Sequence, residues 1–89
     1  MAEAYIIDAV RTPRGVGKPG KGALSHLHPQ HLAATVLKAI KDRNKLDTAT
    51  VDDIIWSTSS QNGKQGGDLG RMAALSAGYD TKASGTTLD

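Results

Sequence analysis

Short strand-like and helix-like patterns alternate along this sequence, and that alternation most limits the folds open to it. Residues 4–10 combine β-branched and aromatic side chains and lead into a Thr-Pro pair, which is typical of a strand. Residues 30–45 place their apolar side chains on one helical face. A second strand is predicted over 53–58, a second helix over 68–77 and a third strand over 83–89. This order predicts an α/β fold with mostly parallel neighbours in the sheet.

The predicted helices carry suitable residues at their ends. Pro29 fits the first helical position, where its missing N–H costs nothing. Asp68 can cap the second helix, and Gly78 stands where a left-handed residue would end it. Gly70 weakens the second pattern, because glycine is a poor helix former.

The composition limits the core that this chain can build. The 89 residues include no cysteine and no phenylalanine, and aromatic residues make up 3%. No disulfide can stabilise so short a chain, and aromatic rings normally supply the largest apolar areas. The core is therefore predicted to consist of Ala, Leu, Ile and Val, as part of a larger core. The chain alone is expected to fold poorly.

Charge and hydropathy exclude several classes of partner. The net charge of +2, from 11 basic and 9 acidic residues, is too small to indicate nucleic-acid binding. No apolar stretch is long enough to cross a membrane. The first residues lack the basic region of a signal peptide. We expect a cytoplasmic protein with neither a nucleic-acid nor a membrane partner.

The glycine-rich loop Gly15–Gly22 has two partial nucleotide-binding patterns. Its G-x-G-x-x-G does not open directly into a helix, since the next predicted helix starts near Pro29. Its near P-loop has Gly22 where a Ser or Thr should hold Mg²⁺. A surface loop is predicted. A stand-alone nucleotide-binding module remains one alternative, and a non-catalytic structural protein is another; binding of NAD or ATP would favour the module.

No catalytic, cofactor-binding or metal-binding residue is predicted within the chain. Three histidines straddle the first helix start without a nearby carboxylate, which favours solvated side chains over zinc ligands: His26, His28 and His31. The hydroxyl residues 57–60 have no candidate base nearby in the sequence. Residues 66–67 precede a helix as an anion site would, but the Asp68 carboxylate would occupy the same positive end.

Five short stretches stand in an order typical of one enzyme family. They are AVRTPRG at 9–15, HLA at 31–33, VDDII at 51–55, GDLGR at 67–71 with the Ala-Gly at 77–78, and TLD at 87–89. Together they resemble the N-terminal segment of the thiolases, acyl-CoA C-acyltransferases. The sequence departs from the family at Asp68 and Asp89, where Asn is common, and at Ser57, where Gly is usual. These departures favour a degradative 3-ketoacyl-CoA thiolase or a divergent member over the biosynthetic type.

The resemblance implies a thiolase-like fold, in which a mixed sheet is layered with helices as αβαβα in the intact enzyme. It also implies that residues 1–89 are an incomplete N-terminal part of the N-terminal domain, ending before the nucleophilic cysteine. In such enzymes a cysteine thiolate accepts an acyl group from a 3-ketoacyl-CoA, and a second coenzyme A removes it. Coenzyme A is then a substrate of the intact enzyme, and this segment binds no cofactor.

The implied partners are the remainder of the polypeptide, an acyl-CoA substrate and further copies in a homodimer or tetramer. In the family, the strand before the cysteine runs along the subunit interface. The residues expected at a dimer interface are therefore Arg71, Thr86, Thr87, Leu88 and Asp89. Arg71 is expected to be structural, with its guanidinium clamping backbone carbonyls or a carboxylate.

Overall fold

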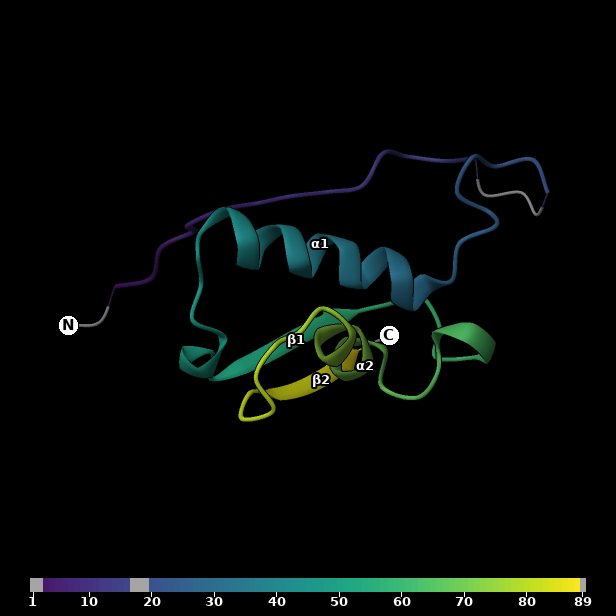
Figure 1. Cartoon of the computed structure of the whole chain (residues 1–89). Helices are drawn as coiled ribbons and strands as arrows, with labels where there is room; N and C mark the ends of the chain where they lie inside the picture. The colour runs from purple at the N-terminus through teal and green to yellow at the C-terminus, as the bar shows by residue number, and fades with distance from the viewer. Residues whose placement is uncertain (1–2, 17–19, 89) are drawn as a thin grey trace.

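Within the described residues, two parallel strands and two α-helices pack together (Figure 1). The structure, a computed structural model, describes residues 3–16 and 20–88. Strand β1 (Asp53–Ser57) pairs in parallel with β2 (Ser84–Leu88), with Ile54 opposite Gly85 and Trp56 opposite Thr87. Helix α2 (Leu69–Ser76) connects the two strands. The predicted β-α-β order and parallel pairing over 53–88 are confirmed.

Helix α1 (Pro29–Arg43) begins as predicted and ends earlier. Pro29 occupies the first turn, and the Gln30 N–H donates to Nδ1 of His28, 3.0 Å away. At the other end Lys45 adopts φ 48°, and the Leu46 N–H returns to the Lys41 carbonyl at 3.0 Å. This left-handed termination closes the helix two residues before the predicted end, although the residue is not glycine.

Helix α2 is predicted over 68–77 and observed over Leu69–Ser76, with Asp68 and Ala77 as its flanking caps. Asp68 caps it from a left-handed conformation, φ 56°, and its Oδ1 accepts from the Arg71 N–H at 3.4 Å. Gly78 has φ 86°, and the following Tyr79 N–H donates to the Ala74 carbonyl at 3.0 Å. Gly78 therefore ends the helix as a left-handed residue, which glycine adopts without steric cost.

The core lies between the helices and one face of the sheet. Its buried members are small, apart from one strand residue and one aromatic residue: Ile54, Ala74, Ala77, Tyr79 and Ala83. Leu37 of α1 and the half-buried Leu46 and Val51 pack against this cluster. The prediction of a purely aliphatic core is wrong at Tyr79, which is 7% exposed. Tyr79 is accommodated because its hydroxyl has a hydrogen-bond partner.

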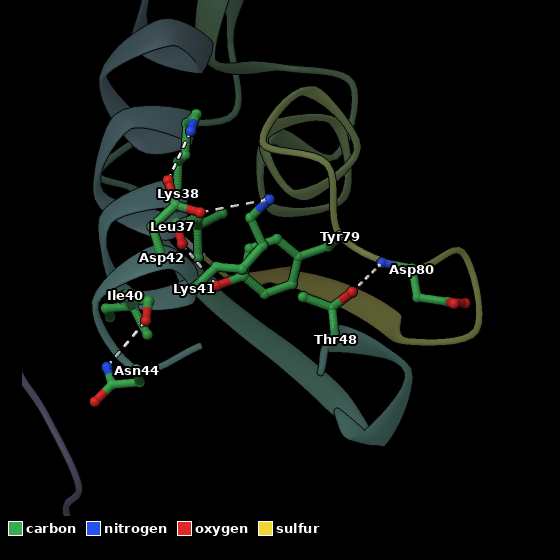
Figure 2. A network of polar contacts seen from close by, with 9 residues as sticks. All are labelled: Leu37, Lys38, Ile40, Lys41, Asp42, Asn44, Thr48, Tyr79 and Asp80. Carbon is green, nitrogen blue, oxygen red and sulfur yellow. Dashed lines mark hydrogen bonds and ion pairs between the residues drawn. The ribbon is translucent and has the colours of Figure 1, made fainter. Parts of the chain in front are cut away.

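Polar contacts connect α1 with the segment that follows α2 (Figure 2). The Tyr79 hydroxyl donates to the Leu37 carbonyl at 2.8 Å. The Asp80 N–H donates to Oγ1 of Thr48 at 2.9 Å, within the short 3-10 helix η1 (Thr48–Thr50). A second 3-10 helix, η2 (Gly63–Gln65), lies in the loop after β1. The first bond joins the middle of α1 to the segment after α2, and the second joins that segment to η1.

The prediction of a strand over residues 4–10 is wrong in this structure. The described sheet contains β1 and β2, and residues 4–10 run past α1 as an extended segment outside it (Figure 1). Tyr5, Ile6 and Ile7 are 76%, 92% and 86% exposed. Asp8 ties the segment to α1, accepting from Asn44 Nδ2 at 2.9 Å and pairing with Arg43 at 3.4 Å. A strand needs a neighbour for its backbone groups, and within residues 3–16 and 20–88 this segment has none.

No helix within these described ranges is both long and apolar enough to span a bilayer.

Candidate functional site at the carboxyl edge of the sheet

The carboxyl ends of β1 and β2 meet at one edge of the sheet, because the strands are parallel. The pairing continues one step beyond β1, where the Thr58 N–H donates to the Leu88 carbonyl at 2.7 Å. The loop after β1 leaves from this edge, and the chain returns to it at the start of α2. Ligands of open α/β sheets bind outside the carboxyl ends of the strands. This edge is therefore the candidate functional site.

Thr87 joins the end of β2 to the start of α2. Its Oγ1 donates to Oδ1 of Asp68 at 2.7 Å and accepts from the Gly70 N–H at 2.9 Å. Its backbone carbonyl accepts from Nε2 of Gln61, in the loop after β1, at 3.4 Å. The first N–H groups of a helix have no partner within the helix. Thr87 Oγ1 supplies an acceptor for one of these groups, the Gly70 N–H, so a strand residue helps to cap α2.

Two glycines let α2 lie directly on the strands. A Cβ at Gly70 would stand 2.6 Å from Trp56 Cβ and 3.2 Å from Thr87 Oγ1. A Cβ at Gly85 would stand 3.1 Å from the Arg71 Cα. Real Cβ atoms essentially never approach within 3.0 Å of another heavy atom. The start of α2 is therefore held against both strands at close range, where a side chain at Gly70 would not fit.

Arg71 ties α2 to the turn that leads into β2. Its Nη1 donates to the Ala83 carbonyl at 2.5 Å, and its Nη2 donates to the Thr81 carbonyl at 3.3 Å. The planar guanidinium serves both carbonyls at once, which a lysine could not do with the same geometry. The predicted clamp on backbone carbonyls is confirmed, and it lies within this chain.

The strand residues predicted for a dimer interface divide between the two faces of the sheet. Thr87 is half-buried and points toward α2, where Asp68 links it to Arg71. Thr86 and Leu88 are exposed, Leu88 by 53%, on the face that α2 does not cover. Asp89 lies outside the described residues. Contact of either face with a second subunit remains a prediction.

The sequence patterns that partly match a metal site or a nucleotide-binding loop either have structural roles or lie partly outside the described residues. His28 caps α1, and the described residues contain no group of three or more His, Cys, Asp or Glu that could hold a metal ion. In the loop Gly15–Gly22, residues 17–19 lie outside the described residues. The chain after Gly20 forms turns, and α1 begins at Pro29, so the loop does not open directly into a helix.

Two hollows in the described surface are lined by residues other than those at this edge. One, of about 320 Å³, lies between residues 5–8 and the C-terminal half of α1, with Ile40, Asn44 and Leu46 in its wall. The other, of about 240 Å³, is lined by His28, Gln30, His31 and Ser76. Neither contains the residues that fix the ends of the strands.

The sequence of the described fold matches a known family along nearly all its length. The family model described as "Thiolase, N-terminal domain" matches residues 4–89. The chain belongs to the thiolase family. The fold described above is the corresponding part of the α/β thiolase fold.

Individual thiolases show the same relationship. A steroid 3-ketoacyl-CoA thiolase of Mycobacterium tuberculosis is 45% identical over 89 residues, 100% of this chain and 21% of that relative. A 3-oxoadipyl-CoA/3-oxo-5,6-dehydrosuberyl-CoA thiolase of Escherichia coli is 41% identical over 90 residues, covering 100% of this chain and 22% of the relative. A 3-ketoacyl-CoA thiolase of Shewanella loihica is 37% identical over 90 residues, which cover 100% of this chain and 23% of that relative. The chain thus spans about a fifth of the length of these curated relatives.

In this thiolase segment the sequence indicates Asp68 as a helix cap, but it does not indicate the contact of Asp68 with Thr87. Gly70 weakens the helical pattern in the sequence, whereas the close approach of Trp56 requires a glycine there. A glycine inside a helical pattern often marks such an approach. The contact between Asp68 and Thr87 joins residues 19 positions apart and has no local signal.

Proposed function

We propose that this chain is the N-terminal part of an acyl-CoA C-acyltransferase that cleaves or forms 3-ketoacyl-CoA through an acyl-cysteine intermediate. The observation that carries the proposal is the match of residues 4–89 to the thiolase N-terminal domain. The similar proteins, named as 3-ketoacyl-CoA and 3-oxoadipyl-CoA thiolases, support the substrate class. Fatty acid metabolism in the cytoplasm is the proposed setting.

The proposed chemistry needs residues beyond this segment. A cysteine thiolate takes the acyl group from 3-ketoacyl-CoA, and the thiol of a second coenzyme A then takes the acyl group from the cysteine. The 89 residues contain no cysteine. We place the nucleophile a few residues after Asp89, at a turn from the strand into a helix whose N-terminus favours the thiolate. Coenzyme A is the proposed substrate, and no cofactor is assigned to the segment.

The proposed role of the segment is to form scaffold and subunit interface. Ile55 and Leu88 are 69% and 53% exposed on the open face of the sheet, and this apolar surface supports contact with further polypeptide. That polypeptide is the remainder of the enzyme and a second subunit of a homodimer or tetramer. The proposed interface residues are those predicted from the sequence: Arg71, Thr86, Thr87, Leu88 and Asp89.

The test combines mass, thiol labelling and turnover. The purified protein is denatured, its polypeptides are weighed, and a thiol reagent locates its reactive cysteine. The native protein is incubated with a 3-ketoacyl-CoA in the presence and absence of coenzyme A. We expect a larger polypeptide, one rapidly labelled cysteine and cleavage that depends on coenzyme A. A single unlabelled species of 9.3 kDa without turnover would contradict the proposal. Tight binding of NAD or ATP by that species would favour the nucleotide-binding alternative.

A further inference from the structure

We infer that Thr87 and Asp68 are positioning residues for the acyl-transfer reaction, which fix the point where the chain leaves β2. The inference rests on the proposed function, because it concerns the nucleophile placed after β2. Neither residue is assigned contact with substrate. Their role is to hold the end of the strand in one place relative to α2.

The hydrogen-bond geometry around Thr87 supports this role. One hydroxyl group acts as donor to Asp68 Oδ1 and as acceptor for the Gly70 N–H, at 2.7 and 2.9 Å. The two bonds run to two different residues of the α2 start, so they restrict both sliding and rotation of the strand end. Asp68 Oδ1 also accepts from the Arg71 N–H, which holds the carboxylate itself in place.

The surrounding packing leaves little room for this contact to shift. Gly70 lies against Trp56 of the neighbouring strand at a distance that excludes a Cβ. The Thr58 N–H holds the Leu88 carbonyl from the other side at 2.7 Å. Thr87 is thus fixed between α2 and β1, one residue before the described end of β2 at Leu88. A displacement of about 1 Å at a reacting group can cost about 100-fold in rate.

The backbone at Asp68 makes the role separable from stability. Asp68 has φ 56°, a left-handed conformation that glycine adopts freely and asparagine tolerates. Asp68→Gly therefore removes the acceptor for Thr87 while it keeps the backbone, and glycine at a helix N-cap is nearly as good as aspartate. Asp68→Asn keeps an oxygen that can accept both bonds and removes the charge.

The experiment compares these variants in the full-length acyltransferase that carries this segment. Thr87→Val removes the hydroxyl at nearly constant shape, and Thr87→Ser restores it. Thr81→Val is the matched control, since the Thr81 side chain is exposed and makes no hydrogen bond within the described residues. The measurements are kcat, KM, the melting temperature and the pH profile of cysteine inactivation by iodoacetamide.

We expect Thr87→Val and Asp68→Gly to lower kcat by about 10- to 100-fold with little change in KM, and to alter the pH profile of inactivation. We expect Thr87→Ser, Asp68→Asn and Thr81→Val to keep the wild-type values within a few-fold. This pattern would support positioning, because a loss of stability alone lowers the folded fraction and leaves the thiol's pH profile unchanged.

Wild-type kcat and pH profile in Asp68→Gly would overturn the positioning role. The same result in Thr87→Val, with only its melting temperature lowered, would also overturn it. If Thr87→Val does not fold, Asp68→Gly decides the question in the same way. A wild-type protein that turns over no 3-ketoacyl-CoA would instead overturn the proposed function, and the positioning role with it.

Discussion

The Tyr79 hydroxyl donates a 2.8 Å hydrogen bond to the Leu37 carbonyl, which joins α1 to the segment after α2 across 42 positions of sequence (Figure 2). Tyr79 is 7% exposed, and its ring packs within the core cluster. A buried hydroxyl without a partner would be costly, so the bond allows this aromatic side chain to lie in an otherwise small-residue core.

Tyr79→Phe should destabilise α1 by about 1 kcal/mol, because the ring stays buried and one hydrogen bond is lost. Hydrogen exchange of peptides from α1, measured in the full-length protein, reports the local unfolding free energy. Tyr5→Phe is the matched control, since Tyr5 is 76% exposed. Equal exchange in both variants would contradict the role of the bond.

The same tyrosine should make the fold sensitive to alkali. Burial, and secondarily the nearby Asp42 charge, raise the pKa of Tyr79 above its ordinary value of 10.0. The unfolded chain then ionises first, so the stabilisation from Tyr79 is complete below about pH 10 and is lost as the pH rises through the folded pKa. Unfolding followed from pH 9 to about pH 12 should show a steeper loss in wild type than in Tyr79→Phe. Identical slopes would exclude this contribution.

Gly70→Ala should destabilise the segment by about 1–3 kcal/mol through overpacking. Alanine in a helix normally gains up to about 1 kcal/mol over glycine. Here the new Cβ would stand 2.6 Å from Trp56 Cβ, which no rotamer change can move away. Ser76→Ala, at an exposed position of the same helix, should change stability by less than about 0.5 kcal/mol. A stabilising Gly70→Ala would show that α2 does not lie this close to β1.

Acid should weaken the C-terminal half of α1. The hydrogen bond from Lys38 is the main cause that lowers the pKa of Asp42 below its ordinary value of 3.8. The unfolded chain therefore takes up the proton first, and the stabilisation from Asp42 is present above about pH 4 and is lost as the pH falls through the folded pKa. Hydrogen exchange of α1 between about pH 2 and 5 should depend less on pH in Asp42→Asn. Asp52→Asn, at an exposed position outside this network, is the control.

Arg71→Ala should lower stability by about 2 kcal/mol, because two carbonyls lose a charged donor. Arg71→Lys should recover only part of this loss, since one ammonium cannot reproduce the guanidinium fork. The melting temperature of the full-length protein should fall, and so should the fraction of the proposed dimer, while kcat/KM per folded molecule should stay near wild type. A large fall in kcat with unchanged melting and assembly would show that Arg71 is not purely structural.

The parts of the fold that could be predicted were those with local signals. Pro29 and Gly78 act through their own backbone angles, so the sequence indicated the start of α1 and the end of α2 correctly. The end of α1 was missed because Lys45 adopts a left-handed conformation that lysine rarely takes. The parallel pairing of β1 with β2 could be predicted because strand and helix patterns alternate along the sequence. This alternation involves only segments that are neighbours in the sequence.

The candidate site depended on contacts that no local pattern encodes. The bond between Thr87 and Asp68 arises only when β2 has paired with β1 and α2 has packed across both. Residues 4–10 have the side chains of a strand, yet a strand also requires a partner, and the described sheet supplies none. Periodicity reveals which face is apolar, but it does not reveal which segment covers that face.

Synthesis from the N-terminus brings residues 5–7 out of the ribosome before any other element of this fold. The unit of β1, α2 and β2 lies within residues 53–88 and is close in sequence, so its residues leave the ribosome together, after residues 5–7. Tyr5, Ile6 and Ile7 stay 76%, 92% and 86% exposed once that unit has assembled. We therefore expect chaperones that bind short apolar stretches to hold the nascent chain at these residues, and to do so for longer than at any residue of α2.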